Sequence, residues 1–347
     1  MPLDNFDAQL DASILSTISI AEDQAAPIGE RDMPIYDVLR YHLGFLDERF
    51  EPERVNAGKR VRPRLCVLAC QASGGDPSRA IHVAAAIELL HNFTLIHDDI
   101  QDQSEFRRHR RTIWDLWGTA QAINAGDAMF AIAHRALNRS IDAGVDPATV
   151  LELSNGLHDA TLRIVEGQVL DLSFERRNDV QASDYLTMIG GKTGALTRCA
   201  CWAGALIAGA DRQQAAQFAE FGAALGIGFQ LRDDILGVWG EPGDTGKSRA
   251  DDIRRRKKSL PVLLLRERAT AEEQALLDAI YEHDDVTADE IEAVLVMMRV
   301  HEVAPDVQAR VLAWHNRARD LLEAAAPDSP ARDAMFDLVK TLEARAS

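Results

Sequence analysis

The sequence predicts an all-α protein, and three observations support this. Ala-, Leu- and Glu-rich segments with helical periodicity recur along the 347 residues. Clusters of Gly, Pro and Asp interrupt them, as at 74–77, 142–147 and 241–246. No series of alternating strands with hairpin dipeptides is present. Asp76 and Asp146 each precede a proline, which is typical of a helix N-cap followed by the first helical residue.

Composition and charge restrict the class of protein. The chain is 46% hydrophobic and carries 38 Lys and Arg against 55 Asp and Glu, a formal net charge of −17. A polyanion would be repelled by that charge, so no nucleic-acid partner is expected. No apolar run is long enough to span a membrane, and the acidic N-terminus does not resemble a signal peptide, so a cytoplasmic protein is expected. The four cysteines, Cys66, Cys70, Cys199 and Cys201, have no metal or redox spacing and are expected to be reduced.

The chain is expected to have one main domain. Residues 1–30 are acidic and only weakly periodic, which predicts an N-terminal extension that is flexible or loosely docked. Residues 31–347 have the length and helical pattern of one large helical domain.

The segment 88–102 contains the first acidic cluster. At about 100° per residue, Leu89, Phe93, Ile96 and Ile100 form an apolar stripe. On the opposite face, Asp98 and Asp102 lie on consecutive turns, with His91 and Thr94 also on this face. Carboxylates so close together repel one another unless a cation lies between them, and hard oxygen ligands suit Mg²⁺. The alternative is a solvated acidic face.

A second acidic cluster makes that alternative harder to maintain. Gln230, Asp233 and Asp234 share one face of the predicted helix around 228–237. Basic residues follow each cluster, at 107–111 and 254–258. A magnesium-bridged diphosphate requires carboxylates that bind the metal and, beside them, basic groups that bind the phosphate oxygens.

Together these motifs resemble the polyprenyl synthetase family, the trans-isoprenyl diphosphate synthases. The segments that carry the resemblance are, in chain order, 57–63, 98–102 with the arginine pair at 107–108, 167–171, 192–194, 229–234 and 246–257. One departure concerns the second aspartate motif, in which Gly237 stands where the family usually has a third aspartate. We expect this to weaken or alter metal binding at most.

The resemblance implies a helical bundle around a deep central cavity, in a homodimer, with the two aspartate motifs facing across the cavity mouth. It implies three Mg²⁺ ions per site. Two of them would be held by Asp98, Asp102 and Asp171, and the third by Asp233.

The resemblance also implies two diphosphate sites. The allylic diphosphate would be bound by Arg107, Lys192 and Lys247. Isopentenyl diphosphate, which needs no metal, would be bound by Lys59, Arg62, His91 and Arg108. The allylic C–O bond ionises as diphosphate leaves, and Lys192, Thr193 and Gln230 would face the resulting cation. No side-chain nucleophile is required.

The residues just before the first aspartate motif are expected to set product length. An aromatic residue five positions before Asp98, here Phe93, resembles synthases that make the C20 product. Geranylgeranyl diphosphate is therefore the expected product, and farnesyl diphosphate the next choice. Thr94 lies one turn before Asp98, whereas Phe93 is about 140° away, so Phe93 either flanks the tunnel or belongs to the packed stripe.

Two other functions stay open. A terpene cyclase on the same fold would not need Lys59, Arg62, His91 and Arg108. A non-catalytic partner subunit would not need the set Asp98, Asp99 and Asp102.

Overall fold

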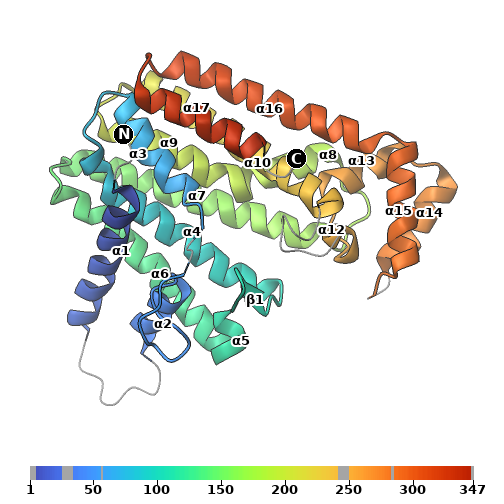
Figure 1. The fold of residues 1–347 in the computed structure, drawn as a ribbon, viewed down its shortest axis with the longest axis horizontal. Helices are drawn as coiled ribbons and strands as arrows, with labels where there is room; N and C mark the ends of the chain where they lie inside the picture. Colours follow the sequence, from blue (N-terminus) through green and yellow to red (C-terminus); the bar gives the residue numbers. More distant parts are fainter. Residues whose placement is uncertain (1–4, 26–33, 56–57, 241–249, 283–284, 345–347) are drawn as a thin grey trace. The chain divides into compact units, whose positions relative to one another are not determined.

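The computed structural model describes residues 5–25, 34–55, 58–240, 250–282 and 285–344, and these are helical almost throughout (Figure 1). The all-α prediction is confirmed. The chain forms two compact units. Unit 1 comprises Met1–Gly156, Ala200–Ala215 and Ser329–Ala331, and unit 2 comprises Leu157–Cys199, Ala216–Asp328 and Arg332–Ser347.

Unit 1 is built mainly from the N-terminal elements. In chain order they are α1 (Phe6–Asp23), α2 (Ile35–His42), α3 (Val61–Ala72), η1 (Pro77–Ala80), α4 (Ile81–Gln101), β1 (Phe106–Arg107), β2 (Arg110–Arg111), α5 (Ile113–Trp117), α6 (Thr119–Asn138) and η2 (Arg139–Ile141). Asp76 and Asp146 act as predicted, because their carboxylates accept hydrogen bonds from the backbone N–H of Ser78 and Ala148.

Helix α4 is the core of unit 1 and packs along α6. Small residues on both helices allow the backbones to approach closely; the buried ones are Ala84, Ala85, Ala86, Ala122, Ala125, Gly126, Ala133 and Ala136. A Cβ at Gly126 would lie 2.2 Å from Nε2 of His97. The segment Pro77–Gln101 is long and apolar enough to cross a membrane by composition, but 67% of its most apolar window is buried inside the protein. We therefore assign it to the protein core.

The N-terminal segment differs from the expected loosely docked arm. Residues 6–23 form α1, which packs against α4 and α6. Its Phe6, Leu10, Ile14 and Ile18 are each at most 2% exposed. These four residues recur every fourth position, which places them along one face of a helix.

Unit 2 contains most of the C-terminal elements. They are α8 (Ala182–Ile189), the π-helical turn η3 (Gly190–Gly194), α10 (Arg212–Trp239), α12 (Asp251–Arg254), α13 (Leu260–Arg268), α14 (Ala271–Glu282), α15 (Ala288–Val300), α16 (Val303–Ala325) and α17 (Pro330–Glu343). Two further helices, α7 (Pro147–Phe174) and α9 (Ala195–Ile207), contribute residues to both units. The core of unit 2 is formed by Leu and Val side chains of α13, α15 and α16.

The four cysteines are buried and form no disulfide with one another, in agreement with the expectation that they are reduced. Burial raises the pKa of Cys70 and of Cys199 to about 12, so both are neutral thiols at physiological pH.

Candidate active site

The C-terminal end of α4 carries the first aspartate motif in unit 1. Asp98 is partly exposed and Asp102 is exposed, whereas Asp99 is only 2% exposed. The Asp99 carboxylate accepts a hydrogen bond from Nε of Arg107 at 2.7 Å and also lies 2.7 Å from its Nη2. Burial raises the pKa of Asp99, and the Arg107 guanidinium opposes that shift. Asp99 therefore anchors Arg107, and the two outer carboxylates face away from the core.

A short hairpin, which the sequence does not predict, presents the arginine pair. Strands β1 and β2 are antiparallel, and Arg107 pairs with Arg110. The two residues between them, Arg108 and His109, have positive φ of 52° and 64°. A two-residue turn with both φ positive usually contains Asn or Gly, and without them the sequence signal is missing. Arg110 ties the hairpin to α2, because it donates to the carbonyl of Tyr41 and lies 4.1 Å from the Tyr41 ring centroid.

Three of the four residues predicted to bind isopentenyl diphosphate, Arg62, His91 and Arg108, lie near one another in unit 1. A Cβ at Gly58, whose φ is +92°, would lie 2.7 Å from Nη2 of Arg108, so the 58–60 loop and Arg108 are adjacent. Nη1 of Arg62 lies 3.3 Å from Nε2 of His91. Since arginine can only donate, this histidine nitrogen accepts. Burial and nearby arginines, Arg62 first, lower the pKa of His91 well below its ordinary value, so the ring is neutral.

A pocket behind the hairpin is lined by arginines 107, 108 and 110 together with His42, Asn92 and Asp99. Burial and the charges of these arginines lower the pKa of His42 to about 3. A neutral histidine beside three guanidinium groups leaves the pocket strongly positive. His42 was not identified from the sequence, because the sequence does not show that α2 packs beside the arginine hairpin.

The two residues predicted to set product length are both partly buried. The Phe93 ring contacts the rings of His97 and Phe130, with centroids 4.9 and 5.2 Å apart. The Thr94 hydroxyl donates to the carbonyl of His91 at 2.7 Å. Phe93 thus belongs to an aromatic cluster between α4 and α6.

Unit 2 brings Lys192 and Asp171 together. A Cβ at Gly167 would lie 2.3 Å from the backbone N of Lys192, so α7 and the π-helical turn η3 are in backbone contact. Nζ of Lys192 donates to Oδ2 of Asp171 at 2.5 Å. Single π-helical turns are frequent at functional sites, and this one presents both Lys192 and Thr193.

The second aspartate motif, on α10, forms a hydrogen-bonded network. Oγ1 of Thr193 donates to Oε1 of Gln230 at 3.0 Å, and Nε2 of Gln230 donates to Asp234 at 3.2 Å. The hydroxyl of Tyr185 donates to Asp234 at 2.6 Å. Burial, with the nearby Asp252 carboxylate second, raises the pKa of Asp234 to about 7. Asp233 is partly exposed and Asp234 is buried.

The position of the missing third aspartate is filled by a neighbour. A Cβ at Gly237 would lie 2.3 Å from Oδ2 of Asp252 on α12. A side chain at 237 would therefore displace the Asp252 carboxylate. Neither Tyr185 nor Asp252 could be assigned to this network from spacing alone, because both lie far from 234 in sequence.

The predicted metal ligands lie in both units, with Asp98 and Asp102 in unit 1 and Asp171 and Asp233 in unit 2. Within the described ranges, no group of three or more His, Cys, Asp and Glu side chains is arranged to hold a metal ion. Asp98 and Asp102 nevertheless fit Mg²⁺, because they are hard oxygen donors on consecutive turns and neither is buried in the core. Lys247 lies outside the described residues.

Comparison with known proteins identifies the family. Residues 49–298 match the polyprenyl synthetase family. The chain is 46% identical over 225 residues to a (2E,6E)-farnesyl diphosphate synthase of Mycobacterium tuberculosis; this match covers 65% of the chain but only 61% of that relative. It is 39% identical to a geranylgeranyl diphosphate synthase of the same species, over 77% of the chain and 75% of that relative.

A solved structure agrees with this assignment. The crystal structure of a polyprenyl synthetase from Streptomyces coelicolor is similar with a TM-score of 0.85 at 34% identity, and the match covers 96% of each chain. The family expected from the motifs is therefore confirmed. Since the family match alone covers well over half of the chain, the protein belongs to the polyprenyl synthetase family.

Proposed function

We propose that the protein is a transferase, a Mg²⁺-dependent prenyltransferase that condenses isopentenyl diphosphate with C5, C10 or C15 allylic diphosphates to a short all-trans prenyl diphosphate. The observation that carries the proposal is the gathering in unit 1 of Arg62, His91 and Arg108 around the 58–60 loop, near the aspartate motif of α4. Guanidinium groups beside a neutral histidine suit a diphosphate headgroup, because guanidinium N–H groups donate charge-assisted hydrogen bonds to phosphate oxygens.

In this proposal each diphosphate has its own basic residues. Arg107, Lys192 and Lys247 bind the allylic diphosphate, and Lys59, Arg62, His91 and Arg108 bind isopentenyl diphosphate. The allylic C–O bond breaks with its electron pair leaving on diphosphate, and the double bond of isopentenyl diphosphate then forms the new C–C bond. The proton released from the condensed chain goes to the departing diphosphate. The path of the cation is lined by Thr193, Gln230 and the backbone of Lys192, whose oxygen atoms point their negative dipole ends at it.

Asp98, Asp102, Asp171 and Asp233 are the residues proposed to hold Mg²⁺, with three ions per site. When bound, Mg²⁺ neutralises charge that develops on the leaving diphosphate. Asp99 is not among the ligands, because its carboxylate is buried and paired with Arg107, whereas the Asp171 carboxylate, though paired with Lys192, is partly exposed.

Two alternatives are less well supported. A terpene cyclase needs no second diphosphate site, yet Arg62 is in contact with His91, and Arg108 lies against Gly58 of the loop that carries Lys59. A non-catalytic subunit would not need partly exposed carboxylates at Asp98 and Asp233.

The deciding experiment is incubation of the purified protein with Mg²⁺, isopentenyl diphosphate and, separately, each allylic diphosphate, with products identified by mass spectrometry. A product ladder that ends at one length is expected. Consumption of the allylic substrate without elongation would indicate a cyclase, and no consumption would indicate a partner subunit.

Geranylgeranyl diphosphate is the proposed product, on the aromatic residue at position 93. Farnesyl diphosphate is the second candidate, because the relative with 46% identity is named as a farnesyl diphosphate synthase. We expect Phe93→Ala to lengthen the product, since the ring fills space between α4 and α6. The measurement is the product distribution, with Phe130→Ala as the matched control on the other side of the contact. An unchanged distribution for Phe93→Ala would remove this residue from the tunnel floor.

We further propose that residues 31–347 act as one catalytic domain, in a cytoplasmic homodimer. What supports the dimer is an exposed apolar stripe on α7, formed by Leu162, Val165 and Val169 at helical spacing. Light scattering tests the dimer. Leu162→Glu and Val169→Glu together are expected to shift the mass to that of a monomer.

A further inference from the structure

The loop that carries Lys59 and Arg62 contains a residue in an unusual conformation. Arg60 has φ of +48°, in the left-handed region, two residues after Gly58 at +92°. A non-glycine residue stays in this region only when its surroundings hold it there. The Arg60 side chain is only 8% exposed, so what surrounds it is protein. Other groups of the protein must therefore stabilise this buried guanidinium.

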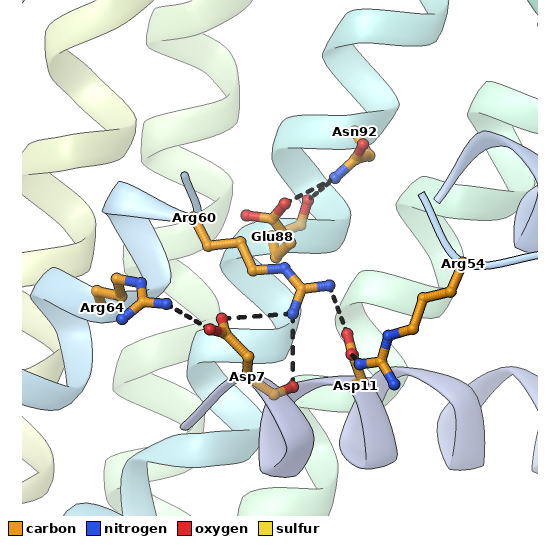
Figure 2. A network of polar contacts seen from close by, with 7 residues as sticks. All are labelled: Asp7, Asp11, Arg54, Arg60, Arg64, Glu88 and Asn92. Carbon is orange, nitrogen blue, oxygen red and sulfur yellow. Dashed lines mark hydrogen bonds and ion pairs between the residues drawn. The ribbon is translucent and has the colours of Figure 1, made fainter. Parts of the chain in front are cut away.

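Two carboxylates of α1 hold it (Figure 2). Nη2 of Arg60 donates to Oδ1 of Asp11. Nη1 of Arg60 lies 3.5 Å from the Asp7 carboxylate and donates to the Asp7 backbone carbonyl at 3.4 Å. Asp7 and Asp11 are four residues apart and therefore lie on the same face of α1. Since Asp11 is itself buried, its pairing with Arg60 is shielded from solvent.

The same carboxylates also bind the residues on either side of Arg60. Asp11 accepts from Arg54 at 2.5 Å, and Asp7 accepts from Arg64 at 2.5 Å. The guanidinium of Arg64 also lies over the Phe6 ring, 4.9 Å from its centroid. Arg60 and Arg64, which flank Arg62, are thus both tied to one face of α1, whereas Arg54 reaches the same face through an exposed side chain.

A third carboxylate, Glu88 of α4, lies on the other side of Arg60 in the same view (Figure 2). Glu88 is buried and accepts a hydrogen bond from Asn92 at 3.2 Å. Burial raises its pKa, and the charges of Arg60 and Arg108 oppose that shift. Glu88 is thus a further carboxylate near Arg60, but the ion pairs of the Arg60 guanidinium are with Asp7 and Asp11 of α1.

We infer that Asp7 and Asp11 are positioning residues for the isopentenyl diphosphate half of the site: by holding Arg60, they fix the backbone that directs Lys59 and Arg62. The inference rests on the proposed function. The first helix, which the sequence indicates only as an acidic extension, thereby becomes part of the substrate-binding apparatus. Arg107 and Lys192, which are proposed to bind the allylic diphosphate, instead pair with Asp99 and Asp171, so that half-site is not expected to depend on α1.

The test is steady-state kinetics of the full-length protein with each substrate varied in turn. For Asp11→Asn we expect the KM for isopentenyl diphosphate to rise about tenfold, because displaced binding groups cost affinity steeply. The KM for the allylic diphosphate should stay within about twofold of wild type. Calorimetric binding of isopentenyl diphosphate without Mg²⁺ gives a second readout and should weaken by the same factor. Asp11→Glu, which keeps the carboxylate, should recover most of the loss.

Arg54→Ala is the matched control. Arg54 pairs with the same carboxylate, but its side chain is 75% exposed, so this pair should contribute little. Wild-type KM values are expected for this variant and for Asp23→Asn at the exposed end of α1. If Asp11→Asn is not recovered folded, Asp7→Asn decides the matter, because its more exposed carboxylate should give a milder rise of about threefold.

If Asp11→Asn raises both KM values equally, or raises neither, the inference is wrong. The proposed function would still hold in that case, provided that the wild-type protein elongates an allylic substrate. A wild-type protein that elongates no allylic substrate would overturn the proposed function and the inference with it.

Discussion

The two aspartate motifs of this protein share a pattern but differ in how the buried carboxylate is stabilised. In each Asp-Asp pair the first residue, Asp98 or Asp233, is partly exposed, and the second, Asp99 or Asp234, is buried. In unit 1 the buried carboxylate is paired with the charged Arg107. In unit 2 it is bonded to the neutral groups of Tyr185 and Gln230.

That difference follows from the neighbours of each motif. Around Asp99 the nearby charges are mainly arginines, which favour an ionised carboxylate. Around Asp234 the nearest charge is Asp252, which together with burial raises the pKa to about 7 and favours a protonated carboxyl. The second aspartate of the pair therefore binds a cationic side chain in unit 1, whereas in unit 2 it belongs to a hydrogen-bond network of neutral groups.

The largest change in rate is predicted for Asp98, the partly exposed member of the first Asp-Asp pair. We expect Asp98→Asn to lower kcat about 10³-fold, because a charged group that stabilises developing charge is lost. The free energy of unfolding should change little, since Asp98 is not in the core. The rate of product formation and urea unfolding measure the two quantities. Asp127→Asn, at an exposed aspartate of α6, is the control, and an equal loss of rate there would contradict the assignment.

The next prediction tests the ion pair between Arg107 and the buried Asp99. Arg107→Met should lower the free energy of unfolding by about 2 kcal/mol, because it leaves the buried Asp99 carboxylate without its cation. Urea unfolding at pH 7 is the measurement. Arg111→Met in the same hairpin removes an exposed arginine from its ion pair with Asp115 and should cost well under 1 kcal/mol. Similar losses in the two variants would mean that burial of Asp99 does not matter.

The positive surroundings in unit 1 also predict a pH effect at His42. Its folded-state pKa of about 3 lies below the unfolded value of 6.5, so the unfolded chain binds the proton first as the pH falls. Because of His42, the free energy of unfolding therefore decreases as the pH falls from 6.5 to 3, by up to about 1.4 kcal/mol per pH unit, and above pH 6.5 this loss is absent. His42→Gln should therefore flatten the stability profile between pH 6.5 and 5. Parallel profiles for the variant and wild type would refute the shift; the other histidines are common to both proteins and cancel in the difference.

The smallest expected effect concerns the neutral network in unit 2. At pH 6, where Asp234 is mostly protonated, Tyr185→Phe removes one neutral hydrogen bond and should cost about 1 kcal/mol. Urea unfolding of this variant beside Arg107→Met sharpens the comparison directly. A loss larger than that of Arg107→Met would show that Asp234 is ionised in the folded protein.

Much of this arrangement could be predicted from local sequence. The helical period and the Gly, Pro and Asp interruptions indicate an all-α chain, and the i, i+4 spacing of Asp98 and Asp102 places them on one face of a helix wherever that helix packs. Capping by Asp76 and Asp146 is equally local, because the hydrogen bond spans only two residues. Such features depend on neighbours along the chain.

Local sequence does not indicate which member of each Asp-Asp pair is buried or which groups surround it, because both depend on how the helices pack. Asp99 and Asp234 are chemically equivalent to the residues before them, but packing removes them from water and supplies Arg107 to one and Tyr185 to the other. The role of α1 was decided in the same way. Its acidic residues look like a solvated extension until the fold brings Asp11 to Arg60, 49 positions along the chain. Desolvation and long-range pairing depend on distances in space, and sequence spacing does not contain those distances.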